Sequence, residues 1–157
     1  SNRMIGRTIL YLTAFIVLLG ASPAFSQDRI FTAEAGMVFH PIQPDKTEDF
    51  EMVMGRVRDA LHESESAVRR NQAENWKVYQ AIEPGPQESV LYIFVIDPAL
   101  EEADYTIGNI LREELPLEAQ ALYETFASCY AYSPSMINMR LASDFNESAT
   151  SDGTSQE

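Results

Sequence analysis

The sequence predicts an α+β domain in which four strands and two helical regions follow one another as β-α-β-β-α-β. Segment 47–63 carries apolar side chains at steps of three and four, which is the spacing of an amphipathic helix. Segments 76–83 and 89–97 alternate as strands and flank the turn-rich PGPQES, a pattern that predicts an antiparallel hairpin. This order is the split β-α-β, or ferredoxin-like, plan, with a four-stranded antiparallel sheet and two helices on one face.

The first 26 residues have the pattern of a secretory signal peptide. Arg7 precedes the apolar run from Ile9 to Gly20, and the small residues of ASPAFS follow that run. Residues 1–3 lie upstream of the signal. A membrane span needs roughly 20 apolar residues, so an uncleaved anchor is the less favoured alternative. We therefore expect an exported protein, periplasmic or secreted, that keeps no membrane segment after cleavage.

Cleavage after Ser26, or after Ala24 as the close alternative, leaves a single α+β domain. Residues 27–143 suffice for one core and are too few for two domains. The polar, acidic tail 144–157 is expected to be disordered. The whole chain has a net charge of −13, which repels nucleic acid and anionic lipid. Cys129 is the only cysteine, so we expect a buried thiol and no internal disulfide.

The first predicted strand lies in GMVFHPI, where Pro41 implies a sheet edge, a strand end or a bulge. Asp45 and Glu48 then have the spacing of a capping pair. They introduce the helix predicted for Thr47 to Glu63, with acids in its first turn where the helix dipole favours them.

The rest of the chain completes the predicted order. The polar segment 64–75 is expected to be a loop or a frayed helical turn. Segment 105–115 has a helical apolar face, and Pro116 should break that helix or restart it. A second helical piece is predicted for 117–130. Segment 136–143 alternates as the fourth strand.

The third strand, SVLYIFVIDP, is apolar on both of its sides. We assign the aliphatic set to the helices, because aliphatic side chains suit close packing, and the aromatic-containing set to the open side. The helix side is then Leu91, Ile93 and Val95, and the open side is Val90, Tyr92, Phe94 and Ile96. Monomeric proteins rarely expose an apolar patch of that size to solvent, so we expect a partner to cover it.

The element order and the strand SVLYIFVIDP resemble the dimeric α+β barrel superfamily over about residues 32–143. In that superfamily two ferredoxin-like units place their open sheet faces together. Antibiotic biosynthesis monooxygenase-like domains and the chlorite dismutase group share this plan. WKVYQAIEPGP followed by YIFVIDP is also similar to small exported bacterial proteins of unknown function. The resemblance implies a homodimer through the open sheet face and does not imply a reaction.

The candidate ligand site predicted by alternation is an apolar cavity on the open face. Its predicted lining is Tyr79, Tyr92, Phe94, Asn138, Arg140 and, if the first strand presents that face, His40. Fourth-strand Ile137 and Met139 are assigned to the helix side. Such a cavity suits a small apolar, aromatic or quinone-like ligand, with Arg140 meeting an anionic group and His40 transferring a proton. The favoured interpretation is that these residues only pack at the dimer interface.

Sequence motifs point to no cofactor and to no dedicated metal site. Neither His40 nor His62 belongs to a ligand motif, and the hydrolase and phosphate-loop patterns are missing from the sequence. The function expected from the sequence is a non-enzymatic dimeric binding or structural module. The alternatives are a cofactor-independent monooxygenase-like enzyme acting on an aromatic small molecule, and docking of the open face onto a different protein.

Overall fold

The computed structural model describes residues 28–147, and the fold is α+β with a four-stranded antiparallel sheet and four α-helices. The predicted signal peptide, residues 1–26, and residues 148–157 of the predicted tail lie outside the described residues. No helix in the described part has the length and hydropathy that crossing a membrane requires.

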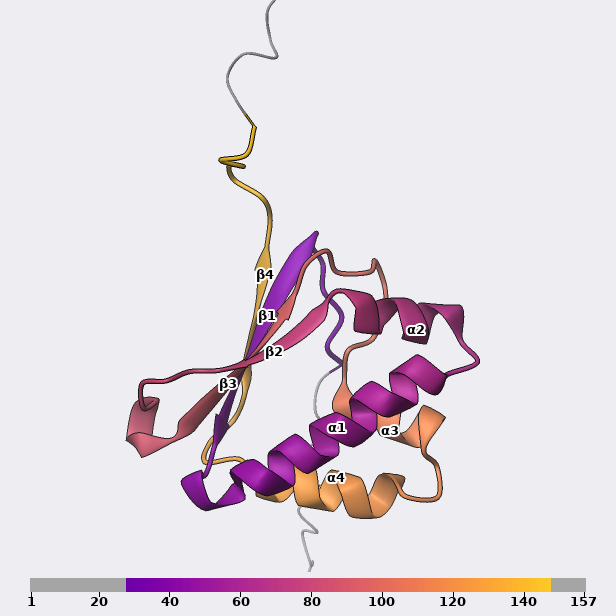
Figure 1. Ribbon diagram of the computed structural model, residues 1–157, viewed down its shortest axis with the longest axis vertical. Coiled ribbons are helices and arrows are strands. Elements are labelled where there is room, and N and C mark those ends of the chain that lie inside the picture. The colour runs from indigo at the N-terminus through magenta and orange to yellow at the C-terminus, as the bar shows by residue number, and fades with distance from the viewer. Residues whose placement is uncertain (1–27, 148–157) are drawn as a thin grey trace, which may run out of the picture.

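The sheet has the strand order β2-β3-β1-β4, and each neighbouring pair is antiparallel. The strands are β1 (Ala35–Ile42), β2 (Trp76–Gln80), β3 (Val90–Ile96) and β4 (Ser135–Met139). The α-helices are α1 (Thr47–Glu63), α2 (Ala67–Glu74), α3 (Ile107–Glu114) and α4 (Ala119–Ser128). Figure 1 shows all four helices on one side of the sheet.

Helix α1 and the β2–β3 hairpin confirm their predictions. The helix begins and ends at the predicted residues and buries the predicted stripe, including Phe50, Val53 and Val57. The hairpin closes through a short 3-10 turn, Pro86–Glu88, and the Gly85 N–H donates to the Ser89 carbonyl at 2.8 Å. Both elements are specified by local patterns, which is why their predictions hold.

The structure corrects the prediction for the segment that forms α2, and it decides between the two alternatives left open at Pro116. Residues predicted as a loop or frayed turn form helix α2, where the Ser66 side chain caps the first turn and Arg69 and Gln72 are buried. The polar composition of this segment led to the prediction of a loop, because the burial of Arg69 and Gln72 depends on partners elsewhere in the chain. Pro116 separates α3 from α4, so the second helical region is two helices rather than one kinked helix.

Pro41 lies inside the sheet without a bulge. The β1–β3 register runs on through the pair Pro41 and Leu91, whereas β4 pairs with β1 only as far as Phe39. The Pro41 carbonyl accepts from the Ala131 N–H at 2.8 Å. The nitrogen of Pro41 points to the same edge of β1 as this carbonyl, and β4 no longer pairs with β1 at that position. The proline therefore removes no ladder hydrogen bond.

The orientation predicted for β3 is wrong. Tyr92, Phe94 and Ile96 face the helices and are at most 3% exposed. The ring of Phe50 from α1 packs on Tyr92 with centroids 4.7 Å apart. Alternation separates two sets of side chains without saying which set faces a helix. The core between sheet and helices holds aromatic rings, such as Phe50 and Phe126, together with aliphatic side chains, so the aromatic set of β3 packs there as well.

The β-sheet register extends this correction to the neighbouring strands. Asn138 pairs with Gly36 on the helix side, so Ile137 lies on the open side, contrary to the prediction. Met139 shares the open side with Ile137. Tyr79 of β2 pairs with Ile93 and lies on the open side, where the prediction places it.

Gly36 lets the chain segment before β1 pack closely against the sheet. A Cβ at this position would overlap the ring of Phe31, which is 3% exposed. We expect Gly36→Ala to displace that ring and lower the free energy of unfolding by about 2–3 kcal/mol. Gly55→Ala is the matched control, since nothing lies within 4 Å of a Cβ there; removing a helical glycine should stabilise by about 0.5–1 kcal/mol. Urea denaturation measures both, and equal effects would contradict the prediction.

Candidate functional site

A pocket of about 820 Å³ lies between the sheet and helices α3 and α4. We call it the helix-side pocket. Its walls come from the segment before β1, from β1 and β3, from α3 and α4, and from the loop that leads to β4. The aromatic side chains in its lining are Phe94, Tyr105, Tyr123, Phe126, Tyr130 and Tyr132. The polar and charged side chains among its walls include Asp28, Arg29 and His40.

His40 is a buried, neutral wall residue of this pocket. Its side chain projects from β1 among aromatic rings, with its centroid 3.9 Å from that of Phe94, and the residue is 2% exposed. Burial, with a further contribution from the charge of Arg29, lowers the pKa of His40 to about 3. The imidazole is therefore uncharged at neutral pH.

One ring nitrogen of His40 has a partner and the other does not. Nδ1 lies 2.6 Å from the hydroxyl oxygen of Tyr130. Burial raises the pKa of Tyr130 well above 10, so both groups are neutral. Nε2 is buried without a hydrogen-bond partner among the described residues. In either tautomer, therefore, the pocket wall holds one unsatisfied donor or acceptor.

Arg29 contributes a positive charge that lacks an anionic partner within residues 28–147. Its backbone is held firmly, because its N–H donates to Thr106 Oγ1 at 2.6 Å and its carbonyl accepts from the Tyr105 N–H at 2.9 Å. Arg29 is half-buried, and this burial lowers the pKa of its guanidinium. A half-buried cation beside neutral aromatic groups favours an anion.

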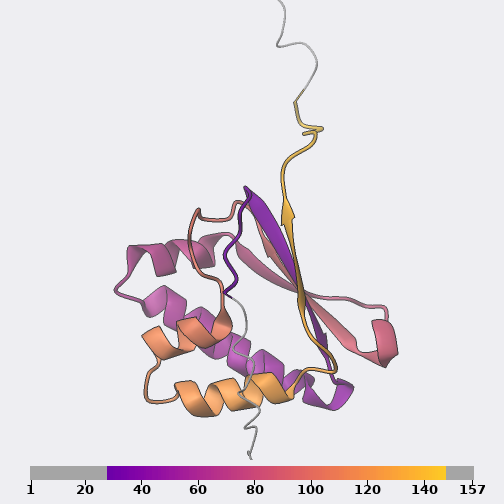
Figure 2. The same ribbon diagram turned by 180° about the vertical axis from the view of Figure 1, so that it is seen from behind.

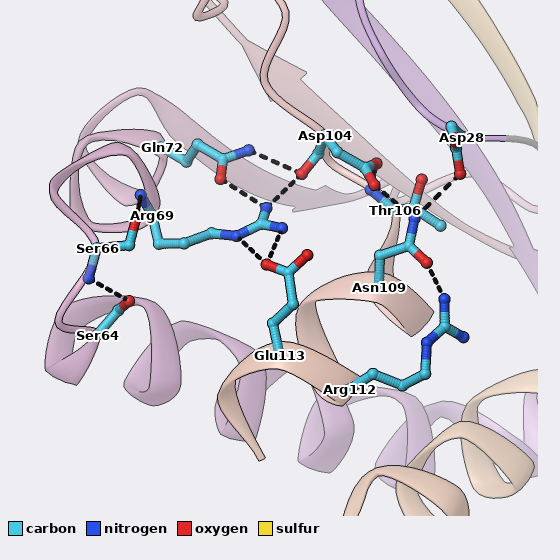
Figure 3. Close-up of polar contacts among 10 residues, drawn as sticks. All are labelled: Asp28, Ser64, Ser66, Arg69, Gln72, Asp104, Thr106, Asn109, Arg112 and Glu113. Carbon is cyan, nitrogen blue, oxygen red and sulfur yellow. Dashed lines mark hydrogen bonds and ion pairs between the residues drawn. The ribbon is translucent and has the colours of Figure 1, made fainter. Parts of the chain in front are cut away.

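A polar network is built around Arg69 (Figure 3). Arg69 is 7% exposed and donates to Glu113 Oε2 from Nε at 3.0 Å and from Nη2 at 2.5 Å. Its Nη1 donates to the Asp104 carbonyl at 2.6 Å, and Gln72 Nε2 donates to the same oxygen at 3.0 Å. Helix α2 is thereby tied to α3 and to the loop before α3.

The same loop is tied to the segment before β1. Asp104 pairs with Ile30 in an isolated antiparallel bridge, and its carboxylate accepts from the Thr106 N–H at 2.8 Å. Asn109 Nδ2 donates both to Asp104 and, at 3.0 Å, to Asp28 Oδ1. Arg69 thus acts on the pocket indirectly, by positioning the backbone next to Arg29.

Replacing Arg69 by methionine is expected to lower the free energy of unfolding by about 2–3 kcal/mol. The variant keeps the length of the side chain and loses its buried, charge-assisted hydrogen bonds. Glu113 is half-exposed and can be hydrated, which limits the cost. Arg58→Met is the control, because Arg58 is on the exposed side of α1 and, within residues 28–147, forms an ion pair with its neighbour Asp59 alone. A similar loss in both variants, measured by chemical denaturation, would show that the network contributes nothing specific.

The residues predicted to line one cavity lie on different faces of the sheet. Tyr79 is on the open face opposite Ile93 and is 52% exposed. Asn138 is on the helix side, where its Oδ1 accepts from the Thr32 N–H at 2.9 Å. Arg140 is exposed and follows the end of β4.

The other three predicted residues face the helices. His40 and Phe94 do meet, but in the helix-side pocket. Tyr92 donates to Glu51 of α1 and is not part of the pocket lining. Sequence reasoning missed Arg29 and the pairing of Tyr130 with His40. The helical spacing of Tyr130 indicates that it faces the interior, so the sequence could have nominated it. Arg29 precedes the first strand in a segment without periodicity, and no pattern indicates its position.

The side of the sheet opposite the helices is apolar, and we call it the open face. Its apolar members are Ala35, Met37, Phe39, Pro41, Tyr79, Leu91, Ile93, Val95, Ile137 and Met139. Lys77 is the only charged residue that the strand registers place there. No described helix lies against this face, as the two opposite views show (Figures 1 and 2).

Comparison of the chain with protein-family models, curated proteins and solved structures found no match. Among the described residues, no three His, Cys, Asp or Glu side chains are grouped so that they could hold a metal ion.

Proposed function

We propose that the protein is an exported, non-enzymatic binding module that forms a homodimer through the open face. The assembly is a dimeric α+β barrel made of two ferredoxin-like units. Export is inferred from the signal-peptide pattern of the first 26 residues. The single observation that carries the dimer is the open face itself, a broad apolar surface with one lysine on a chain whose net charge is −13.

Sheet order supports the ferredoxin-like assignment. Strand β3 lies between β1 and β2, and β1 lies between β3 and β4. Each β-α-β unit is therefore split by a strand of the other unit, which is the defining feature of the split β-α-β plan. With the helices on one side, the second side remains for a partner (Figure 1).

A second copy of the chain is the occupant that suits the open face. A twofold interface requires a patch that is complementary to itself, and an apolar patch meets this requirement where a charged patch would not. Four strands of this length give a footprint of roughly 20 Å by 20 Å, or about 400 Å² on each copy. Two such faces bury less than the roughly 1,200–2,000 Å² of a stable interface.

The segment after β4 can supply the remaining area. Leu141 and Phe145 are 69% and 97% exposed. Figure 2 shows β4 continuing into a segment that leads away from the rest of the fold. In a dimer this segment reaches the second copy, where the two side chains add apolar contacts to those of the open face.

The pKa values of the helix-side pocket favour binding over acid–base catalysis. An efficient general base has a pKa near the working pH. His40, with its pKa lowered to about 3, is a weak base at neutral pH, and burial raises the pKa of Tyr130. The monooxygenase-like alternative would therefore need a proton acceptor other than this pair.

The oligomeric state tests the proposal. Sedimentation velocity and native mass spectrometry of the purified chain should give a dimer mass. Higher salt should strengthen the dimer, because it screens the repulsion between two acidic copies while leaving the apolar contact in place. A monomer at all accessible concentrations would overturn the homodimer. Monomers that aggregate would instead favour docking of the open face onto a different protein.

A further inference from the structure

We propose that the helix-side pocket binds an aromatic carboxylate, with the ring among the aromatic walls and the carboxylate paired with Arg29. This site lies on the opposite side of the sheet from the open face and does not depend on dimerisation. It uses Arg29, Tyr130 and His40, two of which lie outside the cavity expected from the sequence.

Size and lining of the pocket suit a planar ring. Small-molecule sites commonly measure 300–1,000 Å³ and are largely apolar with a few convergent polar groups. The volume of about 820 Å³ exceeds a single benzene ring, so it accommodates a substituted or bicyclic arene. Phe126 and Tyr130 already pack edge to face, at 90° and 5.2 Å between centroids, and offer a ring both stacked and edge contacts.

Charge in the pocket selects an anion. The Arg29 guanidinium is partly desolvated and has no acidic partner within the described residues. Asp28, its neighbour in the pocket lining, keeps its negative charge, but its carboxylate is held by Asn109 and forms no ion pair with Arg29 among the described residues. A planar carboxylate matches the forked donors of an arginine and would compensate the partly buried charge.

Hydrogen-bonding capacity in the pocket wall favours a polar substituent on the ring. His40 Nε2 is buried without a partner in the described part of the chain, and unsatisfied groups of this kind are uncommon in folded proteins. Nε2 exposes no surface in this structure, so a ligand reaches it by displacing a neighbouring side chain; a ring hydroxyl can donate or accept and then satisfies Nε2 in either tautomer. The proposed ligand class is therefore a hydroxylated aromatic carboxylate.

The probe is 4-hydroxybenzoate, compared with neutral 4-hydroxybenzamide and with cyclohexanecarboxylate. NMR titration of the full chain should show saturable binding of the benzoate at the resonances of the pocket residues. We expect at least a roughly tenfold preference over each comparison compound, because the amide lacks the charge and the cyclohexane lacks the aromatic ring. Failure of all three compounds to bind at millimolar concentration would overturn the proposal.

Two variants and one control locate the site. Arg29→Gln should weaken 4-hydroxybenzoate binding by roughly 10- to 100-fold and remove the preference over the amide. Arg140→Gln is the matched control, since Arg140 is exposed and outside the pocket lining, and it should bind as the parent does. Ala127→Trp adds bulk at an exposed position of α4 that lines the pocket, and should abolish binding of every probe.

Folding of each variant is checked by its thermal unfolding curve. An unchanged affinity in a folded Arg29→Gln protein would overturn the assignment of the carboxylate. Ile93→Glu, on the open face, should retain ligand binding even as a monomer. The pocket and the dimer can therefore fail separately.

Discussion

Replacing Ile93 by glutamate is expected to convert the proposed dimer into a monomer. Ile93 lies in the middle of the open face, between Tyr79 on β2 and Phe39 on β1. In a twofold dimer the substitution buries a carboxylate on each copy without a partner. An unpaired buried charge costs about 3–5 kcal/mol, so the dissociation constant should rise by more than about a thousandfold.

Met52→Glu is the matched control for this variant. Met52 is also an exposed apolar residue, at 46%, but it lies on α1 away from the open face. It should leave the dimer intact in sedimentation experiments. The isolated monomer should tolerate both substitutions, because neither side chain is fully buried in it. A dimer that survives Ile93→Glu would show that the two copies meet elsewhere.

Acidification is expected to destabilise the fold from about pH 6.5 downward, above the range in which carboxylates titrate. The pKa of His40 is lowered from its ordinary 6.5 to about 3 by burial and by the charge of Arg29. Below pH 6.5 the unfolded chain binds a proton that the folded chain excludes. Stability is therefore lost as the pH falls, at about 1.4 kcal/mol per pH unit, which gives about 3 kcal/mol by pH 4.5.

The pKa of the Asp104 carboxyl adds to this loss at lower pH. Burial opposes ionisation of this group, but hydrogen bonds from Thr106 and Asn109, with the charge of Arg69, hold its pKa below the ordinary 3.8. Its contribution is present above that value and disappears as the pH falls further. The pH ranges in which His40 and Asp104 contribute are separate, so the stability lost between pH 6.5 and 4.5 measures the contribution of His40.

Urea denaturation of His40→Leu between pH 6.5 and 4.5 measures the effect of His40. Its absolute stability will change because Tyr130 loses a partner, so the quantity compared is the slope of stability against pH. The slope should become nearly flat in His40→Leu. His62→Gln is the control for replacing a histidine outside the core, since His62 is exposed near the end of α1. An unaltered slope in His40→Leu would mean that His40 is protonated in the folded protein.

The sequence predicted correctly those elements that are specified by neighbouring residues, and it missed those that depend on residues far away in the chain. Helix α1 was predicted from its first to its last residue, because one apolar stripe and a change to polar residues mark it locally. The β2–β3 hairpin follows from turn residues between two alternating runs. In contrast, helix α2 is stabilised by Arg69, whose ion-pair partner Glu113 is 44 residues away.

The amino-acid sequence alone determined the α+β class and the four-stranded antiparallel sheet. It also identified His40 and Phe94 as candidate site residues. Only the tertiary structure decided which side of β3 faces the helices. Both sides are apolar, and the alternation of side chains does not indicate which of the two sets is covered. The tertiary structure likewise brought Tyr130 to His40, 90 residues earlier, and placed Arg29 beside them through the bridge between Ile30 and Asp104. Such long-range pairings arise from packing and hydrogen bonding in the folded chain, and they leave no periodic trace in its sequence.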